Sequence, residues 1–278
     1  MGHFKTVSKK RKFQIKIIKL ITAVLFLLYV ISFISRKVNL NSKYLNYLTY
    51  SYLGMEFETK KEELETKPVF KNEAEPIIYL YNTHQTESYK YSKLASYNID
   101  YTVMFASYIL QSYLEDYNIS SVVETTSISK ILKENNLKYG QSYQASRKLL
   151  EQSVINYPSL KYFIDLHRDS SIYEKTTCEL NGEKYAKILF VIGLEHENYQ
   201  ENKIFAEKLN EKLKAVNPCL SRGILEKQGE GVDGKYNQDF NGNTLLLEIG
   251  GQYNEINEAN NTLKVLASIL YEYIMEDS

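Results

Sequence analysis

The chain has 278 residues, enough for one full-sized domain with extensions or for two small domains. Lys and Arg together number 34, as do Asp and Glu, so the chain has no formal net charge at neutral pH. This balance argues against nucleic acid as a partner, because proteins that bind nucleic acid usually carry a basic excess.

The N-terminus combines a basic segment with an apolar one. Residues 1–19 contain seven Lys and Arg residues and no acid, and residues 20–34 contain no charge at all. Extended back to residue 13, the apolar stretch is long enough to cross a bilayer, with Lys16 and Lys19 able to reach the headgroups. We therefore predict an uncleaved transmembrane anchor over residues 13–35. A cleaved signal peptide is the alternative, because the uncharged run is short.

The distribution of charge around the anchor predicts its orientation. Lys and Arg lie mostly on its N-terminal side, which predicts a cytoplasmic tail over residues 1–12 and a catalytic domain outside the membrane. The predicted localisation is the cell membrane, with a single pass. Residues 36–74 show no sustained periodicity and contain a charged stretch, so we predict a spacer there and a catalytic domain over residues 75–278.

From residue 76 onward, short apolar runs alternate with longer amphipathic patterns. Five runs are typical of strands: residues 77–82, 119–125, 161–167, 186–193 and 243–251. Four patterns have helical periodicity: residues 101–117, 141–157, 201–216 and 258–275. Such alternation predicts an α/β fold, a mostly parallel sheet flanked by helices.

Three of the predicted strands end in residues that can bind a metal. His84 and Glu87 follow the first strand, His167 ends the third, and Glu248 lies in the fifth, just before two glycines. In open α/β sheets, ligands bind beyond the carboxyl ends of the strands. These four side chains are therefore expected to meet at one edge of the sheet.

A catalytic zinc site needs about three protein ligands, an open position for water and a nearby base. His84, Glu87 and His167 can supply the ligands, and Glu248 can supply the base. The pattern thus favours a metal-dependent hydrolase. Two simpler interpretations stay open: the histidines as hydrogen-bonded polar residues, and Glu248 as one half of a structural salt bridge.

The remaining histidines and both cysteines show no such pattern. His196 lies in a polar loop and is expected at the surface, while His3 belongs to the basic tail. Cys178 and Cys219 do not have metal-binding spacing, so we predict incidental thiols, with a disulfide as the alternative if the domain lies outside the cell.

Six motifs taken in order resemble one known family. They are "THQTESY", "DLHRDS", "NGEKYAKILFVIG", "SRGI", "YNQD" and "LLEIGG". Together they resemble the stage II sporulation protein P family over residues 75–276. That family comprises membrane-anchored peptidoglycan amidases of endospore-forming bacteria. It is similar to the zinc-dependent N-acetylmuramoyl-L-alanine amidases of the third type, whose fold is then expected here.

The resemblance implies a function, a cofactor and partners. The expected reaction is hydrolysis of the amide between N-acetylmuramic acid and L-alanine of the stem peptide, with Zn²⁺ as cofactor, during spore engulfment. The expected partners are peptidoglycan, the membrane, a lytic transglycosylase and a multi-pass membrane protein. Two alternatives stay open: a zinc endopeptidase acting on stem peptides, and a non-catalytic wall-binding module.

The resemblance also implies roles for individual residues. His84 and His167 are expected to bind zinc, and Glu248 matches the catalytic glutamate of related amidases. In those amidases the third ligand is a glutamate on a helix after the first histidine. Here no glutamate follows in that stretch before Glu115, so Glu87 is the candidate.

Residues around these positions are given supporting roles. Arg168 is expected to act in catalysis beside Glu248. Asp165 and Asp169 are expected to hold the zinc ligands in place, with Asp169 and Arg168 fixing the imidazole of His167. The residues expected on the substrate side are Arg222, Asn237 and Gln238.

Overall fold

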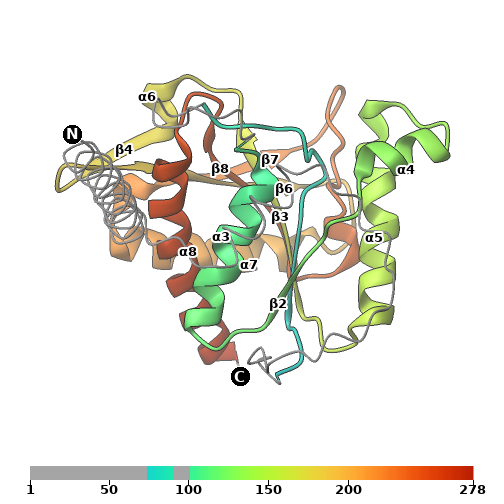
Figure 1. Cartoon of the computed structure of the whole chain (residues 1–278), viewed down its shortest axis with the longest axis horizontal. Coiled ribbons are helices and arrows are strands. Elements are labelled where there is room, and N and C mark those ends of the chain that lie inside the picture. Colours follow the sequence, from blue (N-terminus) through green and yellow to red (C-terminus); the bar gives the residue numbers. More distant parts are fainter. Residues whose placement is uncertain (1–73, 91–100, 278) are drawn as a thin grey trace, which may run out of the picture. The chain divides into compact units, whose positions relative to one another are not determined.

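The computed structural model describes residues 74–90 and 101–277, and within them the sheet has six strands in the order β2-β1-β3-β8-β6-β7 (Figure 1). The strands are β1 (Ile78–Tyr81), β2 (Ser121–Val123), β3 (Tyr162–Asp169), β6 (Ile188–Gly193), β7 (Ser221–Lys227) and β8 (Thr244–Gly251). The first four in spatial order are parallel to one another. Strand β6 runs antiparallel to β8, and β7 pairs with β6 in parallel. The predicted α/β fold with a mostly parallel sheet is confirmed.

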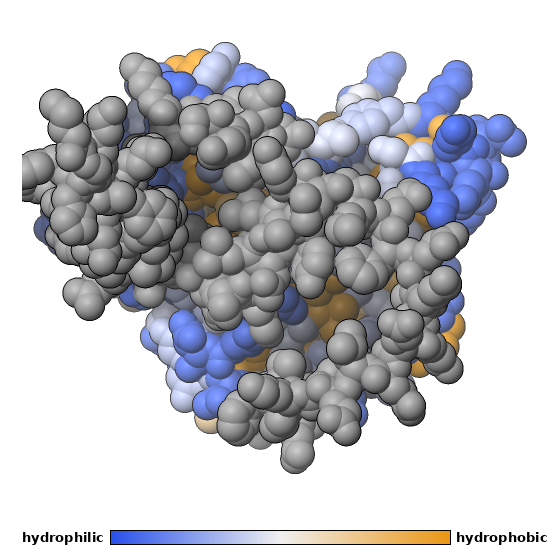
Figure 2. All heavy atoms as spheres, viewed as in Figure 1, coloured by the Kyte–Doolittle hydropathy of each residue, from blue (hydrophilic) through white to orange (hydrophobic). Residues whose placement is uncertain are grey.

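Helices cover both faces of this sheet. They are α3 (Val103–Asp116), α4 (Ile128–Glu134), α5 (Ser142–Asn156), α6 (Tyr173–Thr176), α7 (Tyr199–Val216) and α8 (Ile256–Asp277). Helices α3 and α8 pack against each other, and Figure 1 shows them well apart from α5. The short helix α4 buries only two side chains, and the surface over it is mostly hydrophilic, at the upper right of Figure 2.

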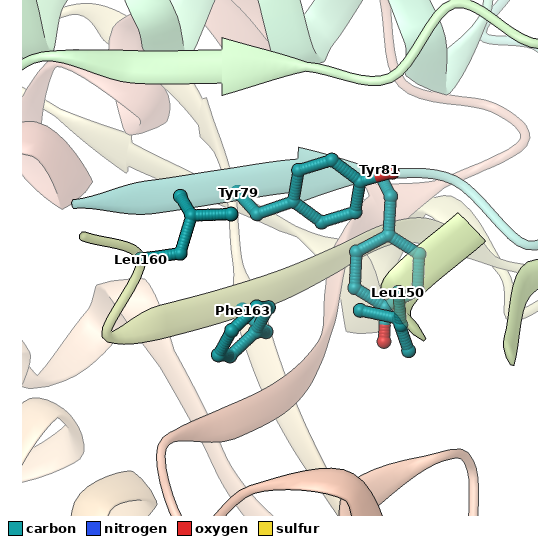
Figure 3. Packing of buried hydrophobic residues seen from close by; sticks show 5 residues of the cluster. All are labelled: Tyr79, Tyr81, Leu150, Leu160 and Phe163. Atoms are coloured by element: carbon teal, nitrogen blue, oxygen red, sulfur yellow. The ribbon is translucent and has the colours of Figure 1, made fainter. Parts of the chain in front are cut away.

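The face of the sheet that α5 covers holds an aromatic core. Tyr79 and Tyr81 on β1 and Phe163 on β3 pack against Leu150 of α5 and against Leu160 (Figure 3). The two tyrosine rings stack with centroids 5.7 Å apart, and Phe163 meets Tyr79 edge-on. Burial of five large side chains at this point fixes how α5, and the turn before it, sit over the sheet.

The same face carries the polar residues of the candidate site. Side chains alternate along a strand, so Phe163, Asp165 and His167 of β3 share one face. The parallel register places Asp165 beside Leu246 and His167 beside Glu248 of β8. The apolar core therefore lies next to a polar cluster near the carboxyl ends of β3 and β8.

A β-bulge interrupts β8 immediately after Glu248. The pairing with β3 shifts, so that His167 faces Glu248 but Asp169 faces Gly251. Gly250 takes up the extra length with φ of 66°, a left-handed conformation that suits glycine. A Cβ atom at Gly250 would lie 2.7 Å from the Cβ of Ala186. Gly250 thus has a structural role in the bulge at the end of β8.

The sequence did not predict several of the shorter elements, and three of these omissions concern the sheet and its surroundings. Helix α4 is one, strand β7 is another, and the third is a hairpin of β4 (Thr177–Leu180) and β5 (Glu183–Ala186). The hairpin turns at Asn181 and Gly182, both with positive φ. Asn-Gly is a common turn dipeptide in two-residue hairpins, so a usable signal was present.

The predicted state of the cysteines is wrong. Cys178 on β4 and Cys219 in the 3₁₀ turn η2 (Pro218–Leu220) form a disulfide, with Cα atoms 5.9 Å apart. The interpretation as incidental thiols rested on spacing along the chain. Their 41-residue separation says nothing about distance in space, and the fold brings the hairpin beside the start of β7.

The predicted membrane localisation is corrected as well. No helix in residues 74–90 and 101–277 is long and apolar enough to cross a membrane. The predicted anchor, residues 13–35, lies outside the described residues, as do the predicted tail (1–12) and almost all of the spacer (36–74). The structure therefore gives no support for a single-pass membrane location.

Candidate metal centre and active site

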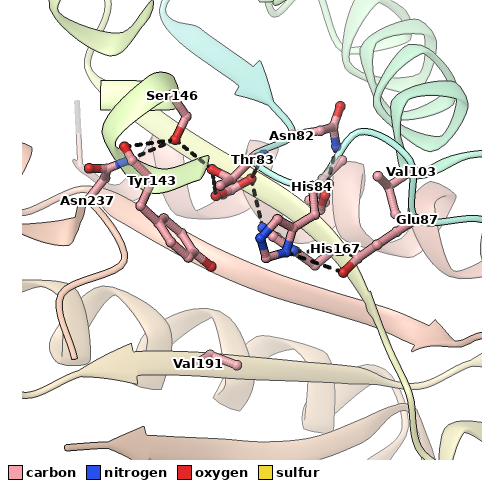
Figure 4. Close-up of polar contacts among 12 residues, drawn as sticks. Asn82, Thr83, His84, Glu87, Val103, Tyr143, Ser146, His167, Val191 and Asn237 are labelled. Carbon is pink, nitrogen blue, oxygen red and sulfur yellow. Dashed lines mark hydrogen bonds and ion pairs between the residues drawn. The ribbon is translucent and has the colours of Figure 1, made fainter. Parts of the chain in front are cut away.

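Two strand ends bring the three predicted ligands together. His84 and Glu87 lie in the turn that follows β1, and the amide of Glu87 donates to the carbonyl of His84 at 3.0 Å. This tight turn directs both side chains the same way. His167 comes from β3, the neighbour of β1, and its imidazole faces them (Figure 4).

The spacing of the ligand atoms suits a metal ion. The Nδ1 atoms of His84 and His167 each lie 3.5 Å from a different oxygen of Glu87. One atom from each residue can be chosen so that all three lie within 4.8 Å of one another. Tetrahedral zinc with bonds near 2.0–2.2 Å separates its ligand atoms by about 3.3–3.6 Å. The cluster of His84, Glu87 and His167, called the His-Glu-His cluster below, therefore fits the expected ion.

The carboxylate of Glu87 is held in its charged form. Burial opposes its ionisation, but interactions with His167 and His84 and the backbone amide of Arg168 hold its pKa well below the usual range. That amide donates to Oε2 of Glu87 at 3.0 Å. The Arg168 side chain donates from Nε to the carbonyl of Ser88 at 3.1 Å, which ties the turn to β3.

Asp165 contacts the imidazole of His167. Its Oδ1 atom lies 3.0 Å from Nε2 of His167, and both groups are buried. The same carboxylate accepts hydrogen bonds from the amide and hydroxyl of Thr83, at 2.9 and 2.7 Å. Burial disfavours the charged imidazole, yet Asp165 and Glu87 raise the pKa of His167 well above its ordinary value. A site that stabilises positive charge in this way is suited to a cation.

Glu248 is the unpaired acid of the site. It lies beside His167 in the sheet register, and its buried Oε2 atom has no hydrogen-bond partner among the residues that the structure describes. Burial raises the pKa of Glu248 to about 7, against the opposing effect of His167. A carboxylate with this pKa can both accept and return a proton near neutral pH. A structural salt bridge, the simpler interpretation, does not describe these contacts.

Asp169 and the residues predicted on the substrate side form ion pairs or hydrogen bonds with other residues of the domain. Arg222, near the start of β7, pairs with Asp169 at 2.7 Å, so Asp169 contacts Arg222 where a contact to His167 was expected. Asn237 donates to the carbonyl of Tyr143 and to Ser146. Gln238 is fully buried.

The amide group of Gln238 is bound at both ends. It accepts from the amide of Gly193 and donates to the carbonyl of Val191. Both amide side chains, Asn237 and Gln238, thus hold backbone segments in place. Their expected role on the substrate side, with that of Arg222, stays a prediction.

Sequence reasoning missed two tyrosines beside His84. Tyr139, in the 3₁₀ turn η1 (Tyr139–Gln141), stacks on the imidazole with centroids 5.1 Å apart, and Tyr143 meets it edge-on at 5.7 Å. Their spacing of four residues was the available signal. It was weak because the chain contains 25 tyrosines. His196, expected at the surface, is half-buried, with both ring nitrogens enclosed.

Comparison with known proteins then decides the family. The model of the family described as "Stage II sporulation protein P (SpoIIP)" matches residues 46–271, most of the chain. The chain belongs to the stage II sporulation protein P family. The match begins before the region in which the motifs predicted it, residues 75–276.

A stage II sporulation protein P from Bacillus subtilis (strain 168) is similar in sequence. It is 32% identical over 202 residues, which are 70% of this chain and 50% of that protein. The chain therefore spans about half the length of the curated relative it matches.

Solved structures resemble the fold more distantly. The CwlD amidase from Clostridioides difficile in complex with the GerS lipoprotein is 14% identical, over 72% of this chain and 97% of that chain, with a TM-score of 0.45. The N-acetylmuramoyl-L-alanine amidase AmiC2 of Nostoc punctiforme is 10% identical, over 72% and 97%, with a TM-score of 0.39. A metallo-carboxypeptidase from Burkholderia cenocepacia is 9% identical, over 76% and 60%, with a TM-score of 0.45. Scores of this size carry no functional conclusion for the stage II sporulation protein P chain.

Proposed function

We propose that this chain is a zinc-dependent peptidoglycan hydrolase that acts in sporulation. The bond we assign to it is the amide between N-acetylmuramic acid and L-alanine of the stem peptide. Membership of the stage II sporulation protein P family supports the setting. The chemistry is supported by the site, and the peptide-cleaving and wall-binding alternatives enter as outcomes of the test below.

One observation carries the proposal. Beside three side chains spaced like metal ligands lies a fourth, Glu248. Its buried Oε2 atom has no hydrogen-bond partner within residues 74–90 and 101–277, and its pKa is raised to about 7. Burying an unpaired carboxylate costs free energy of folding, so its presence calls for a function. A wall-binding module gains nothing from such a group, whereas hydrolysis of an amide needs a base.

The roles of the residues follow from their contacts. When bound, a zinc ion would activate water and polarise the scissile carbonyl. His84, Glu87 and His167 would hold it, and Asp165 keeps the His167 ring oriented from its far side. Glu248 accepts a proton from the attacking water and delivers it to the departing amine of L-alanine. The backbone amide of Arg168 donates to Glu87 and holds its carboxylate beside His84 and His167.

The decisive experiment compares the wild-type chain with Glu248→Gln. We expect the substitution to lower release of stem peptides from purified peptidoglycan by about 10²–10⁴-fold, because a general base is lost. Zinc content should remain unchanged, because Glu248 is not one of the three ligands. Mass spectrometry of the products measures the first quantity, and metal analysis measures the second.

A matched control is Glu226→Gln. Glu226 is an exposed glutamate of β7 that pairs with Lys203 at 2.8 Å, so its loss should leave turnover unchanged. Full turnover in Glu248→Gln would refute the assignment of the base. Products cut within the stem peptide would identify an endopeptidase, and wild-type protein without bound zinc would favour a wall-binding module.

A further inference from the structure

A row of three tyrosines borders the candidate site on the side of α5. Tyr139 stacks on His84, Tyr143 meets the same ring edge-on, and Tyr236 meets Tyr143 edge-on at 5.3 Å. We call Tyr139, Tyr143 and Tyr236 the aromatic row. It thus extends from a predicted metal ligand toward the centre of the sheet.

The row lies on the same face of the sheet as Glu248. Antiparallel pairing places Leu189 of β6 beside Glu248 and Val191 beside Leu246. The apolar cluster of Leu189, Val191 and Leu246 packs against Tyr143 and Tyr236. An apolar, aromatic surface therefore borders the proposed base.

Tyr139 presents a free ring surface beside the metal ligands. One ring face lies nearly parallel to His84, at 19°, while 59% of the residue is exposed. Its turn is fixed, because Lys138 donates to the Gln141 side chain and Ser142 donates to the Tyr139 carbonyl. The surface over neighbouring α4 is mostly hydrophilic (Figure 2).

Tyr236 has an unfavourable backbone conformation. Both Tyr236 and Asn237 have positive φ, 54° and 57°, which is rare for residues with side chains. Hydrogen bonds stabilise this conformation: the Tyr236 amide donates to Asp233, and the Asn237 side chain donates to Tyr143 and Ser146. Strained positions that the surroundings enforce tend to cluster at functional sites.

We infer that the aromatic row binds a sugar ring of the glycan strand, with Tyr139 as the main stacking platform; this rests on the proposed function. The C–H groups on one face of a pyranose carry partial positive charge and suit the negative face of an aromatic ring. The peptide part of peptidoglycan carries carboxylates, which call for cations. The row consists of uncharged side chains, whereas the cations close to the site, Arg168 and Arg222, come from β3 and β7.

The test measures binding of a glycan that lacks peptide. The probe is tetra-N-acetylchitotetraose, titrated into the full chain, which cannot cleave it as an amidase. We expect Tyr139→Ala to weaken binding about five- to tenfold, and Tyr139→Phe to retain it, because stacking needs the ring and not the hydroxyl. Tyr157→Ala is the control. Tyr157 is a 37% exposed tyrosine at the other end of α5, and its loss should leave binding unchanged.

Two further measurements separate the possible outcomes. If Tyr139→Ala binds the probe like the wild type but loses zinc, Tyr139 only positions His84, and the inference is overturned. It is overturned equally if the wild type does not bind the probe, or if Tyr139→Ala weakens binding of free stem peptide instead. Probe binding that depends on Tyr139 in a chain that releases no stem peptide supports the glycan subsite and refutes the amidase proposal.

Discussion

Glu248 shows how one buried side chain couples stability to pH. The pKa of its carboxyl rises from 4.5 to about 7 because burial penalises the charged form. In the unfolded chain the group ionises at the lower value. Folding therefore favours the protonated form of Glu248. The contribution of this group to the free energy of unfolding is fully present below about pH 4.5 and is lost as the pH rises through about 7.

We expect Glu248→Gln to remove this dependence in the metal-free chain. Relative to the variant, the wild type should lose about 3 kcal/mol of unfolding free energy between roughly pH 4.5 and pH 8. Urea unfolding in the presence of a chelator, at a series of pH values, measures the difference. Parallel pH profiles for the two proteins would contradict the burial of an unpaired carboxyl.

Around the His-Glu-His cluster, individual polar contacts hold the side chains in place. Thr83, two residues after the end of β1, donates twice to Asp165, and Asp165 faces His167. Ser146 of α5 bonds the Thr83 hydroxyl in turn. Asp165 and His167 are neighbours on β3, but Thr83 and Ser146 come from distant parts of the chain, so these contacts form only when β1, β3 and α5 meet.

At the scale of elements, the regular part of β8 ends in a bulge immediately after Glu248. Its residues alternate up to Glu248 and then lose register with β3 at Gly250. Without the bulge the strand would continue straight, and the turn after Gly251, capped by Asn254, would move. The "LLEIGG" motif thus combines the proposed base with the bulge that follows it in β8.

We expect Gly250→Ala to lower unfolding free energy by about 2–4 kcal/mol, because it adds a clash with Ala186 to the strain of positive φ. Amidase turnover should fall too, since Glu248 is displaced. Thermal unfolding and product release measure the two effects.

Gly182→Ala is the matched control for this substitution. Gly182 has φ of 81° in the hairpin turn, but no atom of the described part of the chain lies within 4 Å of a Cβ there. Gly182→Ala should lower the free energy of unfolding only by the strain of positive φ, roughly 1 kcal/mol, and leave turnover unchanged. Equal effects of the two substitutions on turnover would argue against a role for the bulge.

At the scale of the whole molecule, the His-Glu-His cluster links the turn after β1 to β3. An ion held by both should stabilise the folded chain over the unfolded one. We expect zinc at 100 times its dissociation constant to add about 2.7 kcal/mol, and to raise the midpoint of thermal unfolding by about 5–10 °C.

Calorimetry with and without a chelator measures this shift. His84→Ala should abolish most of it, whereas His196→Ala, a histidine outside the cluster, should preserve it. A shift that survives loss of His84 would place the ion elsewhere. No shift in the wild type would mean that the cluster does not bind zinc.

The sequence by itself determined the α/β class, the order of its main strands and helices, and the strand ends that carry His84, His167 and Glu248. It could do so because apolar periodicity reports burial locally, and carboxyl ends of parallel strands share one edge. It did not reveal the Cys178–Cys219 disulfide, the edge strand β7 or the aromatic row. Those depend on which segments meet in space, and the pairing of distant residues is decided only when the sheet assembles and α5 packs across it.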